Sequence, residues 1–391
     1  MAQDRWQLGV LLYDESMMPR RKLLAATLLA STLLVAGSLA ALAQDQPPVK
    51  VLIVGLEHGH VAGFIPAFPK QHEAELVGIV DPDAALRGKY EQQYHLDHSL
   101  FFANLDTAIA ERHPQALLVY TSVGDHRRVI EAAAAHNLDV MVEKPLTLSV
   151  ADALAIRKAA REHHIQVLVN YETTWYSSNK AVYDLAQQGK LGDIRKVVVH
   201  DGHEGPKEIG VQPEFLKWLS DPAKNGAGAL YDFGCYGADL MTWLTHGETP
   251  ISVTAVSQTD KPDIYPNVDD DATIIIRYPH TQAVLMPSWN WTFGRKDMEV
   301  YGTKGTAFAL NPTQIKTRFH DGSEAETTTA TPLAAPEDTS LHYLAAVVNK
   351  QLDPKGDLTA LDTNMIVVQI LDAARQSAAE GKTITLKPLP N

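Results

Sequence analysis

The sequence has almost no cysteine, since Cys235 stands alone among 391 residues. One cysteine cannot form an intrachain disulfide, and it cannot supply a thiolate set for a structural zinc ion. A hydrophobic core must therefore hold the fold. A chain of this length is long enough for two domains, each with a core of its own.

Basic residues are outnumbered as well. The chain carries 34 Lys and Arg residues against 47 Asp and Glu residues, which gives a net charge of −13. A nucleic-acid-binding surface needs concentrated positive charge, so the composition predicts no nucleic-acid partner. A hydrophobic content of 45% and a charged content of 21% are ordinary for a globular protein.

Residues 1–43 have the layout of a secretory signal peptide. A basic segment at residues 19–22 precedes an apolar stretch at residues 23–42, and residues 41–44 offer a small-residue cleavage pattern. This order predicts export to the periplasm or the cell exterior, with no stable membrane anchor. The alternative is an uncleaved anchor, because the apolar stretch approaches the roughly 20 residues that a spanning helix needs.

The start of translation and the export route stay open. The basic segment of a signal peptide normally lies near its start, so translation is expected to begin at Met17 or Met18. Arg20 and Arg21 match the twin-arginine (Tat) signal in part, with Pro19 before the pair, and the Sec route is the alternative.

Residues 48–170 predict a dinucleotide-binding Rossmann domain, that is, a doubly wound parallel sheet. An apolar strand at Val49–Val54 leads into a glycine-containing turn at residues 55–60. A second apolar strand, Ala74–Val80, ends at Asp81. Strand, glycine turn, helix and strand with an acidic end is the order of a dinucleotide-binding βαβ unit.

The acid after the second strand indicates which cofactor the domain would take. Asp81 lies 26 residues after Gly55, against a usual spacing of about 20. Its carboxylate would accept hydrogen bonds from both ribose hydroxyls and repel a 2′-phosphate, which favours NAD over NADP. Glu57 and His60 replace the second and third glycines of the usual fingerprint, and a plain βα turn is the alternative. The candidate cofactor contacts in the turn are Gly55, Leu56, His58, Gly59 and His60.

The same alternation of elements continues to residue 170. Helices are expected at residues 61–71, 105–111, 128–136 and 149–163, and strands at residues 116–120, 140–142 and 167–170. Short loops between such units predict parallel strands.

The strand at residues 140–142 ends abruptly in Glu143, Lys144 and Pro145. A parallel strand buried on both faces is nearly all hydrophobic, so charges at its carboxyl end lie where open α/β sheets bind ligands. Pro145 fixes how Lys144 leaves the strand, because the proline ring restricts φ. A surface salt bridge beside a turn is the alternative.

Residues 171–391 predict a second α/β domain with a mostly antiparallel sheet. Helices are expected at residues 178–188, 341–351 and 362–380, and the last two would cover a sheet face. Gly302 and Gly305 suit a turn. Strands are expected at residues 194–200, 272–278, 282–288, 298–300 and 306–310.

A glycine-rich stretch at residues 226–240 carries the second candidate chemistry. If it is helical, Asp232 and Tyr236 are four residues apart and share one face. An acid and a phenol near a lysine could transfer protons, because a cationic neighbour lowers the pKa of a phenol. The alternative is a packed helix in which both side chains bond locally.

Together these stretches resemble the Gfo/Idh/MocA oxidoreductase family over about residues 48–388. Residues 143–145 correspond to its EKP signature, and residues 121–126 to its TPxxxH-like loop, with Ser122 in place of the proline. Residues 228–236 look like its DxGxH/Y helix. Tyr236 stands at the last position, as in the branch that includes glucose–fructose oxidoreductase and dihydrodiol dehydrogenases.

The resemblance implies hydride transfer between nicotinamide C4 and a secondary carbon of a sugar, polyol or glycoside. It implies that Lys144 touches the nicotinamide ribose and the reacting hydroxyl, that Tyr236 acts as acid or base, and that Asp232 orients the pair. It adds cofactor contacts at Thr121, Ser122, His126 and Glu143.

Aromatic and polar side chains at the start of the second domain suit a carbohydrate substrate. His200 and His203 could instead bind a metal, but no third or fourth ligand is evident in the sequence, so no metal is predicted. The family resemblance and an exposed sheet face also predict a homo-oligomer. The candidate substrate contacts are Tyr171, Glu172, Trp175, His200 and His203.

Export constrains the chemistry, because no free pool of NAD exists outside the cytoplasm. The expectation is a tightly held cofactor that is reduced and reoxidised within one active site. An oxidoreductase that couples two sugars satisfies this and is favoured. A glycosidase that transiently oxidises a 3-hydroxyl and eliminates the aglycone satisfies it as well. A sugar- or cofactor-binding protein without catalysis is a third alternative, to which Glu57 and His60 point.

Overall fold

A computed structural model describes residues 47–390 of the chain. Residues 48–391 form one compact unit. The predicted signal peptide at residues 1–43, with its possible starts at Met17 and Met18, lies outside the described residues. Within the described part of the chain, no helix combines the length and the apolar character that crossing a membrane requires.

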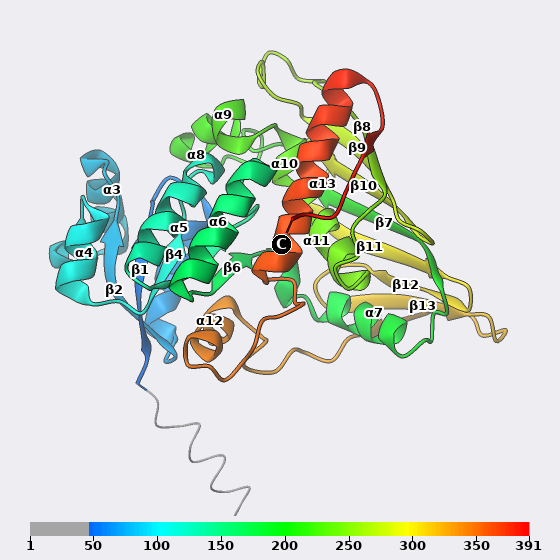
Figure 1. Cartoon of the computed structure of the whole chain (residues 1–391), viewed down its shortest axis with the longest axis horizontal. Coiled ribbons are helices and arrows are strands. Elements are labelled where there is room, and N and C mark those ends of the chain that lie inside the picture. The colour runs from blue at the N-terminus through cyan, green and yellow to red at the C-terminus, as the bar shows by residue number, and fades with distance from the viewer. Residues whose placement is uncertain (1–46, 391) are drawn as a thin grey trace, which may run out of the picture. The chain divides into compact units, whose positions relative to one another are not determined.

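The first sheet has six strands in the order β3-β2-β1-β4-β5-β6 (Figure 1). All its strand pairs are parallel. The order reverses between β1 and β4, which is the switch point at which doubly wound sheets bind ligands. The predicted Rossmann fold is thus confirmed. The strands are β1 (Val49–Val54), β2 (Ala74–Val80), β3 (Phe101–Phe102), β4 (Ala116–Val119), β5 (Asp139–Glu143) and β6 (Val167–Asn170).

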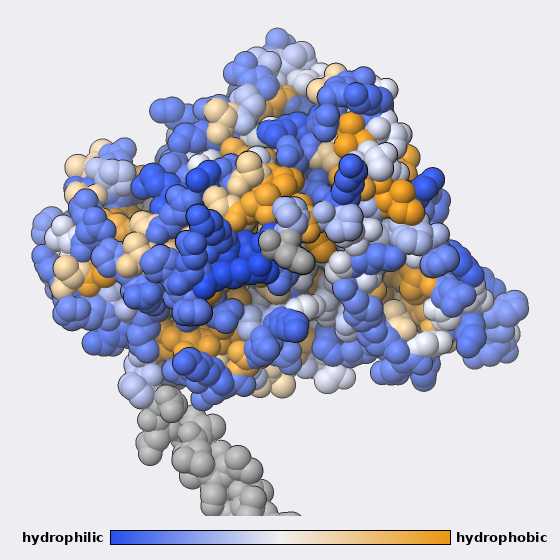
Figure 2. Space-filling model, viewed as in Figure 1, coloured by the Kyte–Doolittle hydropathy of each residue, from blue (hydrophilic) through white to orange (hydrophobic). Residues whose placement is uncertain are grey.

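Helices cover both faces of this sheet, and Figure 2 shows the outer surfaces of α4, α5 and α6 as predominantly hydrophilic. The chain also forms a 3₁₀-helix, η1, from Ile65 to Lys70. The prediction of one helix over residues 61–71 is therefore wrong in its second half, because Pro66 and Pro69 lack the N–H of an α-helical turn. The helices are α2 (His60–Phe64), α3 (Ala84–Tyr94), α4 (Leu105–Arg112), α5 (His126–Ala135) and α6 (Val150–His163).

The second sheet has nine strands in the order β14-β13-β12-β11-β7-β10-β9-β8-β15. Only β7 and β10 pair in parallel, so the predicted mostly antiparallel sheet is confirmed. The predicted turn at residues 302–305 joins β11 to β12. The strands are β7 (Ile194–Gly202), β8 (Ser252–Gln258), β9 (Asp271–Arg277), β10 (Gln282–Ser288), β11 (Arg295–Gly302), β12 (Gly305–Ala309), β13 (Gln314–Phe319), β14 (Glu326–Thr329) and β15 (Ile384–Thr385).

The two C-terminal helices each cover a sheet face, but not the same sheet. Helix α13 contacts β8 and α11 of the second domain and α6 of the first (Figure 1). Helix α12 instead joins the core of the first domain, where Leu341, Tyr343 and Val347 share a hydrophobic cluster with β1 and β2. The helices of this half are α7 (Ser177–Gln187), α8 (Pro213–Leu219), α9 (Pro222–Asn225), α10 (Ala229–Asp232), α11 (Gly234–Leu244), α12 (Ser340–Val348) and α13 (Leu361–Glu380).

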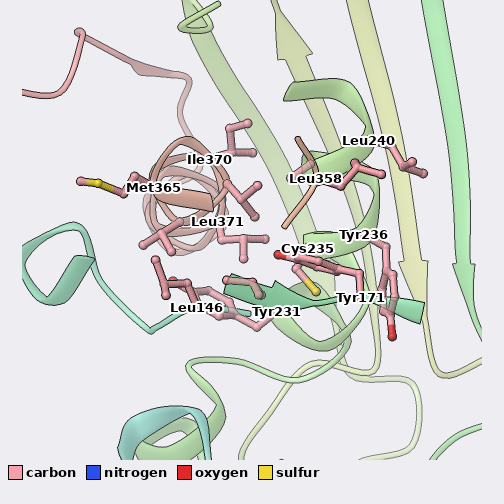
Figure 3. Close-up of a cluster of buried hydrophobic side chains, with 14 of the residues drawn as sticks. Leu146, Tyr171, Tyr231, Cys235, Tyr236, Leu240, Leu358, Met365, Ile370 and Leu371 are labelled. Carbon is pink, nitrogen blue, oxygen red and sulfur yellow. The ribbon is translucent and has the colours of Figure 1, made fainter. Parts of the chain in front are cut away.

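One hydrophobic cluster runs through both domains and holds their junction. Figure 3 shows Leu146, next to the charged end of β5, together with Tyr231 and Cys235 of the second domain and with side chains of α13. A continuous apolar junction resists relative motion of the two domains. The carboxyl end of β5 is therefore held in a fixed position against α10 and α11.

Candidate active site

Two cavities open at the carboxyl ends of the Rossmann strands, one on each side of the switch point. The first, called here the β2-side cavity, has a volume of ≈ 610 Å³ and is lined by Gly55, Asp81 and Thr121, among others. The second, the β5-side cavity, has a volume of ≈ 240 Å³ and is lined by His60 and Glu143, among others. The two halves of a dinucleotide lie on these two sides in a doubly wound sheet.

A third cavity of ≈ 600 Å³, the sheet cavity, is formed largely by the second domain. Its lining includes His203, Phe233 and Lys296. Glu172 lines both this cavity and the β5-side cavity, so the two spaces adjoin at that residue. A substrate in the sheet cavity would thus meet a ligand held at the end of β5.

Gly55 allows the turn after β1 to pass close to the end of β4. Its φ of 92° lies in the left-handed region, and a Cβ at this position would come within 2.7 Å of Thr121 and Tyr120. Only glycine combines that backbone conformation with that close approach. The first predicted glycine of the turn therefore has the geometric role that a dinucleotide-binding turn requires.

Asp81 lies at the end of β2, where the ribose of a dinucleotide is expected. Its carboxylate accepts hydrogen bonds from the backbone N–H of Leu56 and of Asp83, both at 2.8 Å. Burial raises the pKa of Asp81, and the two N–H groups oppose that effect. Leu56 contributes this N–H group, while its side chain is fully buried in the core.

Glu57, which stands where the usual fingerprint has its second glycine, is hydrogen-bonded. Its Oε1 accepts a hydrogen bond from the backbone N–H of Ser122 at 2.7 Å, and this bond joins the turn after β1 to the loop after β4. The carboxylate thus lies at the switch point, between the β2-side and β5-side cavities.

Lys144 forms a buried ion pair with Asp232 across the domain junction. Its Nζ donates to Asp232 Oδ1 at 2.6 Å and to the Asp232 backbone oxygen at 2.9 Å. Burial opposes both charges, but their attraction outweighs it, so the pKa of Lys144 is raised and that of Asp232 is lowered. The indole of Trp289 donates to the second carboxylate oxygen of Asp232 at 3.0 Å. Lys144 therefore bonds a specific acid at the site instead of forming a surface salt bridge.

Tyr236 lies beside this pair but is not the phenolate-like group that the sequence suggested. Its ring centroid is 5.1 Å from Lys144 Nζ and 4.8 Å from Lys296 Nζ. Burial raises the pKa of Tyr236 well above its usual value, so the expected lowering by Lys144 does not occur here. The expected continuous helix is also broken, because α10 ends at Asp232 and α11 begins at Gly234. Tyr236 is thus a protonated phenol.

Glu143 points to the opposite side of β5 and bonds the turn after β1. The Nδ1–H of His60 donates to Glu143 Oε2 at 3.0 Å, and Asn170 Nδ2 donates to Oε1 at 3.1 Å. The indole of Trp175 donates to Asn170 Oδ1 at 3.1 Å. Burial raises the pKa of Glu143, but the charge and hydrogen bond of His60 outweigh it and lower the pKa. The result is a histidine held by a buried carboxylate, with its ring at the β5-side cavity.

Among residues 47–390, two groups of side chains have ligand atoms close enough for a metal ion: His58, His60 and Glu143, and His200, Asp297 and Glu299. In both groups, hydrogen bonds explain why the side chains lie so close together. His58 Nδ1 accepts the backbone N–H of His60 at 3.2 Å, so the proton of the neutral ring occupies Nε2, its only other possible ligand atom. Asp297 is held by Arg295 at 2.7 and 2.8 Å. The pair of His200 and His203, which was weighed as an alternative when no metal was predicted, is in neither group.

Three predicted contacts lie elsewhere. His126 is fully buried, and its Nδ1 lies 3.1 Å from the backbone oxygen of Pro145, so it supports the turn after Lys144 instead of lining a cavity. Tyr171 is buried, and its hydroxyl donates to Asn364 at 2.8 Å. His200 points to the opposite face of the sheet from its neighbour Asp201, because side chains alternate along β7.

Lys296 was not predicted as a site residue, whereas Asp201 was expected among the polar groups that suit a sugar. They are register partners on β11 and β7, and Lys296 forms an ion pair with Glu172. Glu172 also accepts a hydrogen bond from the hydroxyl of Tyr176 at 2.5 Å. Lys296 stands between Arg295 and Asp297 in the charged first half of β11, so nothing in the sequence distinguishes it, and only the strand register shows that it faces Tyr236.

His203 lines the sheet cavity as predicted, in one fixed tautomer. Its Nδ1 accepts the backbone N–H of Gly205 at 2.9 Å. Burial lowers its pKa, so the neutral ring carries its proton on Nε2. His203 can therefore donate a hydrogen bond to a ligand oxygen from Nε2.

These residues fit a nicotinamide dinucleotide. Gly55 permits the close approach at the switch point, and Asp81 lines the cavity where the adenosine ribose would lie. Glu143 lines the other half, next in sequence to Lys144. A bound nicotinamide would accept or supply the hydride. The chain's own residues would hold the cofactor and transfer the proton of the substrate hydroxyl.

A Rossmann domain joined through a buried lysine–aspartate pair to an antiparallel domain is the architecture of a two-domain nicotinamide-dependent oxidoreductase. Residues 49–171 match the oxidoreductase family with an NAD-binding Rossmann fold, and residues 179–308 match the GFO/IDH/MocA C-terminal domain. The chain belongs to the Gfo/Idh/MocA family.

The relatives span several dehydrogenases. A trans-1,2-dihydrobenzene-1,2-diol dehydrogenase from Xenopus laevis is 23% identical over 64% of this chain and 74% of its own length. The structure of an aldose–aldose oxidoreductase from Caulobacter crescentus complexed with glycerol has a TM-score of 0.74 at 23% identity, over 87% of this chain and 100% of that chain. An inositol dehydrogenase homolog from Azotobacter vinelandii complexed with NAD⁺ has a TM-score of 0.72 at 18% identity, over 88% and 98%. These structures establish the fold alone.

Proposed function

We propose that the protein transfers hydride between NAD and a carbon that bears a secondary hydroxyl in a sugar, polyol or glycoside. One observation carries the proposal. The buried pair of Lys144 and Asp232 lies beside the protonated phenol of Tyr236, at the junction of the cofactor domain and the second domain. Hydride transfer at such a carbon needs a group that takes or returns the hydroxyl proton within hydrogen-bond reach.

Each residue of this cluster has a distinct role in the proposal. Tyr236 donates its phenolic proton to the carbonyl oxygen during reduction and takes it back during oxidation. Lys144 places its positive charge near the oxygen at which negative charge develops, and Asp232 holds the ammonium group there through its 2.6 Å bond. His203 donates a second hydrogen bond from Nε2, which fixes the orientation of the substrate.

The charges around the sheet cavity favour an uncharged substrate with many hydroxyl groups. Lys296 is paired with Glu172, and Arg295 with Asp297. No net charge from these pairs remains to bind a carboxylate or phosphate. The ring of Phe233 adds an aromatic wall of the kind that sugar faces contact. The substrate class is therefore a neutral carbohydrate or polyol.

The β2-side cavity supports NAD over NADP. Two cations, Arg128 and Lys217, line it, and an added 2′-phosphate would lie among an excess of negative charge. The carboxylates that line it are Glu57, Asp81, Asp83, Asp106, Asp125 and Glu214.

The sequence pattern of residues 1–43 motivates the further proposal that the mature protein works outside the cytoplasm with tightly held NAD. The test is to denature the purified protein and identify the released nucleotide by mass spectrometry. We expect NAD at close to one equivalent per chain. A protein that releases no nicotinamide and gains no thermal stability from added NAD would instead be a binding protein without this catalysis.

A second candidate function, the glycosidase, is favoured by His60. Elimination from a transiently oxidised glycoside needs a second group to remove a carbon-bound proton. His60 is held at Nδ1 by Glu143, as a general base is held by its carboxylate, and no hydrogen bond forms to its Nε2 within residues 47–390. Incubation with 4-nitrophenyl glucosides, following nitrophenol and NADH together, separates the two functions. Nitrophenol release without net NADH would favour the glycosidase.

A further inference from the structure

The two cofactor cavities are separated by a short segment of the second domain. Helix α8 lies against the turn after β1, where a Cβ on Gly59 would come within 2.6 Å of the ring of Phe215. The rings of Phe215 and His58 lie 4.6 Å apart, and the indole of Trp218 donates to the backbone oxygen of Glu57 at 3.2 Å. Together with the bond between Glu57 and Ser122, these contacts lie across the switch point.

A dinucleotide that fills both cavities must pass through this place. Its diphosphate joins the two nucleosides, and in a Rossmann fold it crosses beside the glycine turn. Here Phe215 and Trp218 cover that turn. The backbone N–H of Ser122, which could otherwise donate to the diphosphate, donates to the carboxylate of Glu57. The diphosphate must therefore displace Glu57, and it would then lie beneath α8.

The segment that carries α8 is attached mainly through side chains and is bounded by glycines. Glu208 pairs with Lys261 and Lys224 with Asp125, both at 2.7 Å. Phe215, Trp218 and Leu219 form a small hydrophobic cluster with Val123 that is separate from the two main cores. An ion pair at 2.6 Å between Lys89 and Glu214 adds one link to α3. Small separate clusters open at a lower free energy than the main core.

Glycines stand at both ends of the segment. Gly205 has a φ of 128° and Gly226 a φ of 87°, conformations that other residues adopt rarely. Residues 206–225, called here the cover, thus have at each end a backbone position that glycine adopts more readily than other residues.

We propose that the cover forms the second wall of the dinucleotide site, and that Phe215 and Trp218 close over the diphosphate and control its passage. The inference rests on the proposed function, since it takes NAD as the ligand. It assigns cofactor contacts to the second domain, where the sequence predicted none. It also supplies a physical reason for retention: the cofactor leaves only when the cover opens.

The test compares two phenylalanines of equal exposure in the full-length, NAD-loaded protein. Phe215 and Phe68 are each 7% exposed, but Phe68 lies in η1 and lines neither cofactor cavity, although its ring packs against Phe64 of the β5-side cavity. NAD release is followed by rapid filtration after dilution, and NAD uptake by protein stripped of cofactor is followed separately. We expect Phe215→Ala to raise both rates about tenfold, which corresponds to about 1.4 kcal/mol in each barrier. Phe68→Ala should leave both rates unchanged.

The outcomes separate this proposal from the one on which it rests. Unchanged rates of NAD release and uptake in Phe215→Ala would overturn the proposal that the cover controls passage of the cofactor. Faster release with unchanged uptake would also overturn it, because Phe215 would then be a simple contact that does not limit passage. A wild-type protein that neither holds nor takes up any nicotinamide would overturn the proposed function as well.

Discussion

At the scale of single residues, the site depends on charges that are buried in compensating pairs. Lys144 and Asp232 are 4% and 6% exposed, so neither charge could persist there alone. Glu143 is equally enclosed and relies on His60 and Asn170. The two side chains at the end of β5 thus bond different parts of the protein: Lys144 bonds Asp232 of the second domain, and Glu143 bonds His60 of the turn after β1.

Lys144→Ala should abolish turnover and leave a folded, less stable protein. The substitution leaves Asp232 buried without its partner, which lowers the unfolding free energy by about 3–5 kcal/mol. Urea unfolding and hydride transfer to NAD measure the two effects. The double variant Lys144→Ala/Asp232→Asn should recover part of the stability but none of the turnover. Near-normal turnover in Lys144→Ala would mean that the pair only supports the fold.

At the scale of elements, glycines show where the chain tolerates no side chain. Gly55 precedes α2 and Gly63 lies within it, yet their surroundings differ completely. A Cβ on Gly55 would meet backbone atoms of Tyr120 and Thr121 at 2.7 Å, whereas nothing lies within 4 Å of a Cβ on Gly63. The same substitution should therefore have opposite effects at these two positions.

Gly55→Ala should destabilise the protein by about 2–3 kcal/mol and remove its cofactor, because it adds both a clash and an unfavourable φ. Gly63→Ala should stabilise it by about 0.5–1 kcal/mol, since alanine loses less backbone freedom when the helix forms. Thermal unfolding and bound NAD per chain are the measurements. Equal cofactor content in the two variants would contradict the role given to Gly55.

The elements that could be predicted from sequence are those with a strong hydrophobic pattern. Strands β1, β2, β5 and β10 bury most of their residues and were expected within one or two residues of their bounds. Helix α3 was missed because it buries only Tyr90, which leaves no apolar period to detect. Helix α8 was missed for another reason: Phe215, Trp218 and Leu219 have helical spacing, but a helix of seven residues is too short for that spacing to stand out in the sequence.

Only those residues of the candidate site that belong to a recognisable sequence motif could be predicted. Lys144, Asp232 and Tyr236 stand in recognisable stretches, and the structure brings them together. Lys296 comes from a strand whose register with β7 decides its direction, and sequence alone does not determine that register. His126 and Tyr171 matched the chemistry expected of ligand contacts, but both are buried and bond other parts of the protein.

At the scale of the whole molecule, buried acids should make stability depend on pH. Asp239 in α11 is fully buried, and neither of its carboxylate oxygens has a hydrogen-bond partner in the part of the chain that the structure describes. Burial raises the pKa of Asp239 well above its usual value. The unfolded chain loses this proton near pH 4, while the folded chain keeps it to higher pH. The unfolding free energy therefore falls as the pH rises between the two pKa values.

Asp239→Asn should remove this contribution and flatten the profile. Above about pH 5, and for as long as the folded protein keeps this proton, the stability of the wild type should fall relative to the variant by up to about 1.4 kcal/mol per pH unit. Urea unfolding at several pH values measures the difference. Asp263→Asn, at an exposed position, should keep the wild-type slope. Parallel profiles for the wild type and Asp239→Asn would show that Asp239 is ionised in the folded protein.

Helix α12, which lies nearly 300 residues after β1 in the sequence, completes the core around that strand. The core that surrounds β1 includes Leu341, Tyr343 and Val347, and the backbone N–H of Val169 bonds the oxygen of Thr359. A ribosome that has made only residues 48–170 has therefore not supplied all of the first domain's core. We therefore expect the first domain to complete its core only after residues 341–359 have been synthesised.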